Sequence, residues 1–259
     1  MLNLNSLNPQ QRQAVETIKG PVLILAGAGT GKTRVITYRI THLIERGIPP
    51  ASILAVTFTN KAAREMQERV TKLLPRNPKS ATGSGSRNTE HGTRPTLCTF
   101  HSLCVRILRQ HIEKLGYKRN FVIYDESDQL SAVKKILARI SAKGEKTDPA
   151  AILSLLSRLK NGGDRAAVFA DESVRAMAAH IRSRYESALR SCNAVDFDDL
   201  ILLTLRLFTR HPEALQTCRS KYRYVMVDEY QDTNAAQFQL VQSLTHEHRN
   251  LCVVGDDDQ

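Results

Sequence analysis

Residues 26–33 read Ala-Gly-Ala-Gly-Thr-Gly-Lys-Thr and directly follow an apolar run at 21–25. Glycine at every second position lets the backbone curl, so that successive N–H groups point into one concavity that suits a phosphate. A helix pattern follows, and the positive end of that helix dipole would face the anion. A chance glycine turn is the alternative, but a position between a strand pattern and a helix pattern is the context that a phosphate-binding loop requires.

Two side chains at the end of this loop suit a nucleoside triphosphate. Lys32 would supply a cation for the β- and γ-phosphates, and the Thr33 hydroxyl would be a ligand for Mg²⁺. The loop residues expected at the nucleotide are Ala26, Gly27, Ala28, Gly29, Thr30, Gly31, Lys32 and Thr33. The sequence thus predicts an ATP or GTP site. Ala26 departs from the general loop pattern, which has glycine there.

Two adjacent carboxylates, Asp228 and Glu229, follow the apolar run at 225–227. In a parallel sheet, ligands bind at the carboxyl ends of the strands, so these acids would arrive beside the phosphate loop. One acid could hold Mg²⁺, while its neighbour orients and deprotonates an attacking water. Pairs of acidic residues are common on protein surfaces. This pair indicates a nucleotide site because a strand pattern precedes it and a phosphate-loop pattern lies upstream.

The composition describes a folded, basic protein. The chain has 259 residues, of which 41% are hydrophobic, so a packed core is expected rather than disorder. No apolar run approaches the roughly 20 residues of a membrane span, and the N-terminus lacks the regions of a signal peptide. The five cysteines include no C-x-x-C pair, which argues against a disulfide framework or a zinc site. We expect a reduced, cytoplasmic protein with no membrane partner.

The net charge of +11 is unevenly distributed. Residues 61–120 carry 13 Lys and Arg against 4 Asp and Glu, whereas residues 196–259 carry 6 against 11. A basic stretch of this kind is typical of a polyanion partner such as a nucleic acid. An ordinary solvated basic face would have the same composition, and charge alone does not decide between the two.

The periodicity predicts an α/β fold. Predicted strands are 21–26, 53–58, 96–100, 224–227 and 251–254, with a weaker candidate at 121–124. Predicted helices are 9–19, 32–46, 61–74, 101–115, 126–142, 150–161, 171–190, 197–209 and 234–245, with Asn8 and Asn60 as caps of the first and third. Near-continuous apolar strands that alternate with helices indicate a parallel sheet covered on both faces. The central helices then form an insertion in that domain.

Residues 76–95 contain no apolar side chain larger than alanine and are rich in Gly, Ser, Thr and Asn. That composition is typical of a flexible surface loop.

Seven segments resemble, in the same order, motifs of the UvrD/Rep-type (PcrA-like) superfamily 1 DNA helicases. They are 7–15 (LNPQQRQAV), 26–33 (AGAGTGKT), 56–66 (VTFTNKAAREM), 99–103 (TFHSL), 196–200 (DFDDL), 228–234 (DEYQDTN) and 254–259 (VGDDDQ). The family also carries alanine before the first loop glycine. The resemblance implies the N-terminal half of an ATP-dependent, 3′–5′ helicase or translocase that acts in DNA repair or replication restart.

This resemblance assigns roles at the nucleotide. Gln11 would hydrogen-bond the adenine and Arg34 would pack on its ring, which favours ATP over GTP. Asp228 would hold Mg²⁺ with Thr33. The catalytic residues would be Lys32, Glu229 as the base, and Gln259 as a γ-phosphate sensor linked to DNA. From the residues alone, Arg34 could equally be a solvent-facing helix residue.

The resemblance also implies a path for single-stranded DNA. The implied contacts are Phe58, Asn60, Lys61, Thr99, Phe100, His101 and Ser102. Aromatic faces stack on bases, whereas amides, hydroxyls and a lysine hold phosphates, so the residue types suit the role. Two alternatives stay open, because Phe58 and Phe100 could be core residues at strand ends and His101 could cap its own helix.

The resemblance implies a RecA-like sheet domain interrupted by an all-helical subdomain. The expected parts are 1–112, an insertion at 113–193, and 194–259 as the second part of the sheet domain. Family members continue into a second RecA-like half that completes the ATP site, so we expect this chain to be the N-terminal portion of a longer, monomeric protein that acts on single strands and duplex junctions. Two alternatives remain: a fragment that binds ATP and DNA without turnover, and the motor part of a recombination helicase–nuclease.

Overall fold

The computed structural model describes residues 2–27, 29–74, 94–140, 148–162 and 172–256. The chain forms two compact units, Met1–Leu103 with Glu213–Gln259, and Cys104–Pro212. The second unit contains the whole expected insertion at 113–193 and extends beyond it at both ends. Its larger size follows from packing, because helix α8 (Phe197–Arg210) contacts both α6 (Pro149–Gly162) and the 3-10 turn η4 (Ile112–Leu115). Residues 76–93 of the predicted loop at 76–95 lie outside the described residues.

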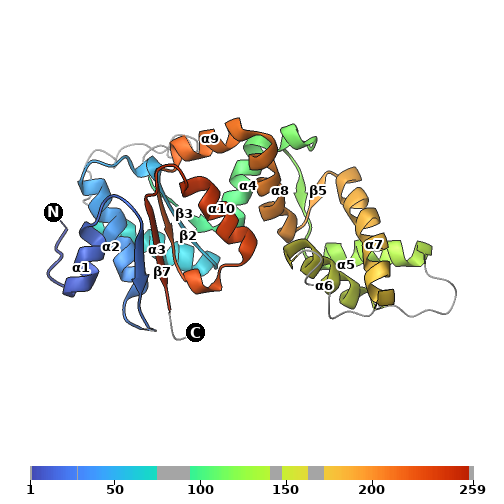
Figure 1. The fold of residues 1–259 in the computed structure, drawn as a ribbon, viewed down its shortest axis with the longest axis horizontal. Helices are drawn as coiled ribbons and strands as arrows, with labels where there is room; N and C mark the ends of the chain where they lie inside the picture. Colours follow the sequence, from blue (N-terminus) through green and yellow to red (C-terminus); the bar gives the residue numbers. More distant parts are fainter. Residues whose placement is uncertain (1, 28, 75–93, 141–147, 163–171, 257–259) are drawn as a thin grey trace, which may run out of the picture. The chain divides into compact units, whose positions relative to one another are not determined.

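The first unit is built on a five-stranded sheet in which every strand pairs in parallel (Figure 1). In spatial order the strands are β1 (Val22–Leu25), β7 (Leu251–Gly255), β6 (Tyr224–Val227), β2 (Ile53–Thr57) and β3 (Thr96–Thr99). The predicted α/β fold with a parallel sheet is confirmed. Because all strands run the same way, the segments that follow them leave from the same edge of the sheet.

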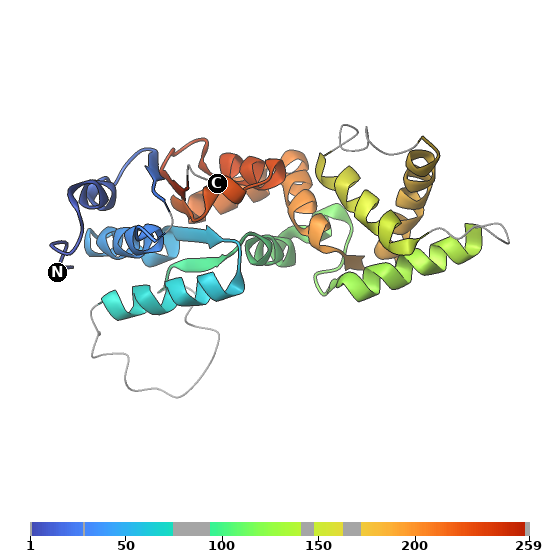
Figure 2. The same ribbon diagram turned by 90° about the horizontal axis from the view of Figure 1, so that it is seen from below.

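Helices cover both faces of this sheet. They are α1 (Pro9–Glu16), α2 (Lys32–Glu45), α3 (Asn60–Leu73), α9 (Pro212–Lys221) and α10 (Ala235–Thr245), with the short 3-10 turns η1 (Pro50–Ser52) and η6 (Tyr230–Asp232). Both views place α3 and α10 on opposite sides of the sheet (Figures 1 and 2). Buried side chains of α2 and α3, among them Ile40 and Met66, form one core with Ala55 and Met226 of the strands.

The edge strand β1 departs from the expectation of a sheet covered on both faces. Its residues alternate between half-buried and exposed, and the side chains of Leu23 and Leu25 are 63% and 58% exposed. Val22 and Ile24, on the other face, pack against the core that α2 and α3 cover.

Local sequence explains where the helices begin. Asn8 caps α1 as predicted, since its side chain accepts from the Gln11 N–H, while the Asn8 N–H donates to the side-chain oxygen of Gln11. The predicted Asn60 cap of α3 is wrong, because Asn60 is already helical and Thr59, in extended conformation, accepts from the Ala62 N–H. The short helix α9 was not predicted, and it buries only Ala214 and Cys218.

The second unit is mostly helical. Its helices are α4 (Phe100–His111), whose first turn belongs to the first unit, η4 (Ile112–Leu115), α5 (Glu126–Ile140), α6 (Pro149–Gly162), α7 (Glu172–Ser191) and α8 (Phe197–Arg210). The expectation of an all-helical insertion needs one correction. Strands β4 (Val122–Ile123) and β5 (Ala194–Val195) form a short parallel pair. The apolar residues at 194–195 thus pair with a strand that precedes the inserted helices in the sequence.

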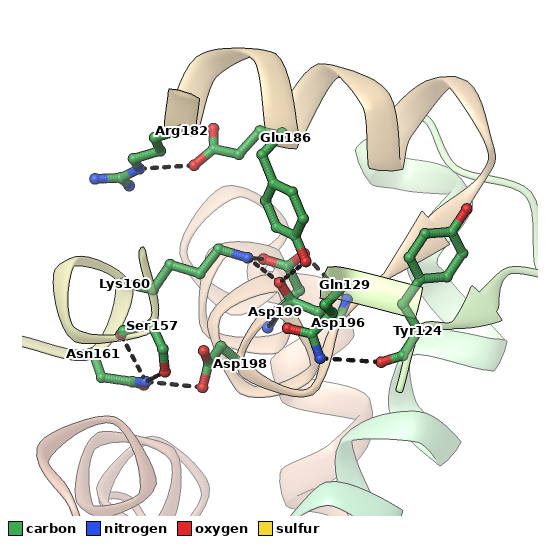
Figure 3. A network of polar contacts seen from close by, with 11 residues as sticks. Tyr124, Gln129, Ser157, Lys160, Asn161, Arg182, Glu186, Asp196, Asp198 and Asp199 are labelled. Carbon is green, nitrogen blue, oxygen red and sulfur yellow. Dashed lines mark hydrogen bonds and ion pairs between the residues drawn. The ribbon is translucent and has the colours of Figure 1, made fainter. Parts of the chain in front are cut away.

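A buried polar network joins three helices of this unit (Figure 3). Lys160 of α6 places Nζ 2.6 Å from Asp196 Oδ2 and 2.8 Å from Asp199 Oδ1, and its side chain is 3% exposed. The Tyr185 hydroxyl of α7 donates to Asp196 over 3.2 Å. Asp196 and Asp199 also form the capping box that starts α8. One cation thus pairs with two carboxylates that begin a helix.

We predict that Lys160→Met destabilises the protein by about 3 kcal/mol or more, because it leaves two buried carboxylates without a cation. Chemical denaturation followed by circular dichroism measures the change. The matched control is Arg158→Met on the same helix, where the side chain is exposed, and its effect should stay within about 0.5 kcal/mol. Equal stability of the two variants would contradict the role assigned to Lys160.

Candidate nucleotide and DNA site

The loop between β1 and α2 has the backbone that its glycines predicted. Gly29 and Gly31 have φ angles of 76° and 90°, in the left-handed region that favours glycine. The Ala26 N–H donates to the Gly255 carbonyl of β7 over 3.0 Å, which ties the start of the loop to the neighbouring strand. Lys32 and Thr33 then open α2, so the first turn of a helix faces the loop. Ala28 lies outside the described residues.

Lys32 lies between two carboxylates that come from far along the chain. Its Nζ is 3.0 Å from Asp256 Oδ2 and 3.3 Å from Glu229 Oε2, and its side chain is 9% exposed. Burial opposes its charge, but the hydrogen bonds to Asp256 and Glu229 outweigh burial and raise the pKa of Lys32 above its ordinary value. The lysine is therefore fully charged at neutral pH and is held at the carboxyl edge of the sheet.

Asp228 lies buried beside the hydroxyl of Thr33. It follows β6, is 3% exposed, and its Oδ2 lies 3.4 Å from the Thr33 hydroxyl. Burial and the neighbouring Glu229 raise the pKa of Asp228 to about 6. A buried carboxylate beside a hydroxyl suits Mg²⁺, which prefers one or two protein oxygens together with substrate phosphates. In the described part of the chain, no group of three His, Cys, Asp or Glu could hold a metal, so such an ion would depend on Thr33, Asp228 and the phosphates.

Glu229 differs from Asp228 in its surroundings. Its side chain is 39% exposed, and its backbone is left-handed with φ 52° and ψ 50°. The Gln231 amide donates to Glu229 Oε2 over 2.9 Å, and its oxygen accepts from the Asp256 N–H over 3.0 Å. An accessible carboxylate held by an amide is suited to taking a proton from water.

Gln231 and Asp256 were not predicted as site residues, although both lie in segments that carried the resemblance. Only the fold shows that they meet, because Gln231 follows β6 and Asp256 follows the neighbouring strand β7. Gly255 makes room for this contact, since a Cβ there would lie 3.1 Å from Gln231 Oε1. Gln259, predicted to sense the γ-phosphate, lies outside the described residues.

The two residues expected at the adenine lie beside the loop. Gln11 donates from Nε2 to the Thr30 carbonyl over 3.0 Å. A hollow of about 580 Å³ is lined by Gln11, Thr30, Lys32 and the residues of β1. Arg34 is exposed and lies over the Tyr38 ring, with its guanidinium carbon 5.3 Å from the ring centre. The fold thus brings both predicted residues to the loop, with Tyr38 as an unpredicted neighbour of Arg34.

The predicted DNA contacts follow the adjacent strands β2 and β3, whose ends are in register at Thr57 and Thr99. Asn60 and Lys61 are exposed, while His101 and Ser102 are partly exposed at the start of α4. These polar groups therefore lie at the same edge of the sheet as the phosphate loop.

The two aromatic residues of this group differ in exposure. Phe100 is 1% exposed, and its ring centre lies 5.6 Å from that of the partly exposed Phe58. Stacking of a base directly on Phe100 is incompatible with this burial, so the core interpretation describes Phe100, and Phe58 is the ring that a base could reach. Thr99 is buried and accepts from the Ser102 N–H over 3.2 Å, which makes Thr99, rather than His101, the cap of α4.

Comparison with known proteins agrees with this geometry. Residues 7–259 match the model of the UvrD/REP helicase N-terminal domain. The chain is 45% identical, over 99% of its length, to the ATP-dependent DNA helicase PcrA of Staphylococcus aureus and to that of Bacillus subtilis, and 42% identical to that of Staphylococcus epidermidis. The chain belongs to the UvrD/REP helicase family.

This UvrD/REP helicase domain spans about a third of the length of the curated relatives it matches, 34% of the S. aureus protein and 33% of the B. subtilis protein. Among its described helices, none is both long and apolar enough to cross a membrane.

We predict that Lys32→Ala weakens ATP binding by about tenfold or more, because a charge-assisted hydrogen bond to the β- and γ-phosphates is lost. Titration with a fluorescent ATP analogue measures the affinity, and circular dichroism checks that the variant folds without its ion pair to Asp256. Lys19→Ala, an exposed lysine on another segment, is the control. Equal affinity of wild type and the Lys32 variant would refute the assignment.

We predict that Glu229→Gln, in the full-length protein, keeps ATP binding but slows hydrolysis by about 10²–10⁴, because an amide cannot accept the proton of the water. Steady-state turnover and nucleotide titration, measured side by side, separate the two effects. Glu68→Gln, an exposed residue of α3, is the control. Turnover near the wild-type rate would show that Glu229 is not the base.

Proposed function

We propose that this UvrD/REP helicase domain binds ATP with Mg²⁺ and forms the N-terminal motor domain of an ATP-dependent DNA helicase that moves 3′ to 5′ on single-stranded DNA. DNA repair or replication restart is the proposed setting. The observation that carries the proposal is the convergence of Lys32, Asp228 and Glu229 beside a phosphate loop, although about 195 residues separate the loop from the acids in the sequence. The relatives named as ATP-dependent DNA helicases support the substrate.

The residues suggest how hydrolysis proceeds. Lys32 would turn from its carboxylate partners toward the β- and γ-phosphates and offset their charge. Glu229, oriented by Gln231, would take the proton of the attacking water. Mg²⁺, when bound by Thr33 and Asp228, would neutralise charge that develops on the phosphates. Gln11 and Arg34 would hold the adenine.

The strand order provides the proposed link between ATP and DNA. The proposed nucleotide residues of the sheet edge follow strands β1, β7 and β6, whereas the proposed DNA contacts lie at the ends of β2 and β3 or follow them. The two groups meet at the β6–β2 pair, where the Asp228 N–H donates to the Val56 carbonyl over 3.0 Å. A movement of the Asp228 segment on hydrolysis would thus shift the backbone at Val56, two residues before Phe58.

Turnover should require more polypeptide than this chain. In the proposed mechanism, arginines from a second RecA-like half stabilise the γ-phosphate, and the length of the relatives leaves room for such a half. Loss of one such arginine slows phosphoryl transfer by about 10³–10⁵. We therefore expect the 259-residue chain to bind ATP weakly and to hydrolyse it poorly, and its DNA binding to be weak and sensitive to salt.

The test is DNA-stimulated ATPase activity of this chain and of the full gene product, measured with and without single-stranded DNA. The full product should be stimulated strongly and should unwind a duplex with a 3′ tail in preference to one with a 5′ tail. Robust stimulated turnover by the purified, monomeric chain would show that it completes its own site. Binding of ATP and DNA without turnover by the full product would instead establish a binding module.

A further inference from the structure

Arg39 is the largest fully buried side chain of the protein's described residues and is 2% exposed. It lies on α2, about two turns beyond Lys32. Its Nη1 donates to the carbonyls of Ala14 and Thr17, and its Nε finds no partner among the described residues. Both hydrogen bonds go to the main chain at the end of α1. Burying a guanidinium is costly, so its position needs an explanation.

The acceptors belong to a helix that depends on outside contacts. α1 has eight residues, and a helix of this length is marginal on its own. Of these residues, all of which the structure describes, Val15 is the one that is buried. The Ala14 carbonyl lies in the last turn, where backbone oxygens lack helical partners and the helix dipole favours a cation. The hydrogen bonds of Arg39 therefore add to the packing of Val15 and Ala14 in holding the end of α1 on its neighbour α2.

The opposite end of α1 carries Gln11. Its amide bridges the Asn8 N–H and the Thr30 carbonyl of the phosphate loop, and it lines the hollow beside β1. The place of this amide is set by the place of α1, because Gln11 lies within the capping box that starts the helix. α2 thus holds the phosphate lysine at its first residue and α1 through Arg39.

We propose that Arg39 is a positioning residue for base recognition: by holding the end of α1 on α2, it fixes Gln11 in place beside the phosphate loop, where its amide would meet the adenine. The inference rests on the proposed ATP site and adds a residue that contacts no nucleotide. It implies that a substitution of Arg39 impairs selection of the base and leaves binding of the phosphates nearly unchanged. Lys32 serves the phosphates, whereas Arg39 serves the base through Gln11.

The test compares three ligands with Mg²⁺: ATP, GTP and inorganic tripolyphosphate, which lacks a base. Competition against a fluorescent nucleotide on the 259-residue chain gives each affinity. In Arg39→Met, ATP affinity should fall by about tenfold and the preference for ATP over GTP should disappear, while tripolyphosphate affinity stays within about twofold of wild type. Arg46→Met, an exposed arginine at the end of the same helix, should change none of these values.

Two further variants keep the proposal testable. Arg39→Lys retains a cation, but the lysine side chain is shorter and its ammonium ends before the position of Nη1. It should therefore show the same selective loss to a smaller degree, and it serves as the test if Arg39→Met fails to fold. Gln11→Ala combined with the Arg39 variant should bind ATP no more weakly than Gln11→Ala alone, because Arg39 acts through Gln11.

An equal loss for ATP and tripolyphosphate, unchanged discrimination between ATP and GTP, or additive effects in the double variant would each overturn the role of Arg39. Failure of the proposed function looks different, because the wild-type chain would then show no preference for ATP over tripolyphosphate.

Discussion

The position of β6 between β7 and β2 is the constraint on which the site depends. Parallel pairing on both sides fixes β6 in register, and the Asp228 N–H continues the ladder by bonding to the Val56 carbonyl. Since side chains alternate along a strand, a slip of one residue would turn Asp228 away from Thr33. The pairing of β7 with β1 likewise brings Asp256, which follows β7, to the lysine of the loop after β1. Residues from three distant segments meet because the strands that precede them are neighbours.

Around Lys32, at this edge of the sheet, the acidic side chains outnumber the basic ones. Lys32 is shared by Asp256 and Glu229, and Asp228 lies beside them with a raised pKa. One cation among three carboxylates leaves a local excess of negative charge. This arrangement would repel a triphosphate unless Lys32 changes partners and a divalent cation joins Asp228. The same carboxylates that keep Lys32 charged and in place thus make the proposed binding of ATP depend on Mg²⁺.

Much of the nucleotide site could be predicted from the sequence because its signals are local. Three glycines, Lys32 and Thr33 lie within one loop, and the strand pattern before Asp228 predicted where that carboxylate would arrive. The contacts of Gln231, Asp256 and Arg39 could not be predicted, since each depends on which elements are neighbours in space. Phe100 shows a further limit, because an aromatic residue at a strand end has the same pattern whether it faces the core or a base. Strands β4 and β5 have two residues each, which is too few for a periodicity, so β4 was predicted only as the weaker candidate at 121–124 and β5 was not predicted.

The left-handed backbone of Glu229 has a consequence for how such a domain can change. A residue with a side chain in this conformation costs roughly 1–3 kcal/mol, and glycine would adopt it without that cost. The backbone conformation at this position therefore favours a residue that lacks the proposed catalytic carboxylate. Backbone strain alone would favour glycine here, whereas turnover would favour the carboxylate. At Glu229, the backbone conformation and the proposed chemistry thus favour different residues.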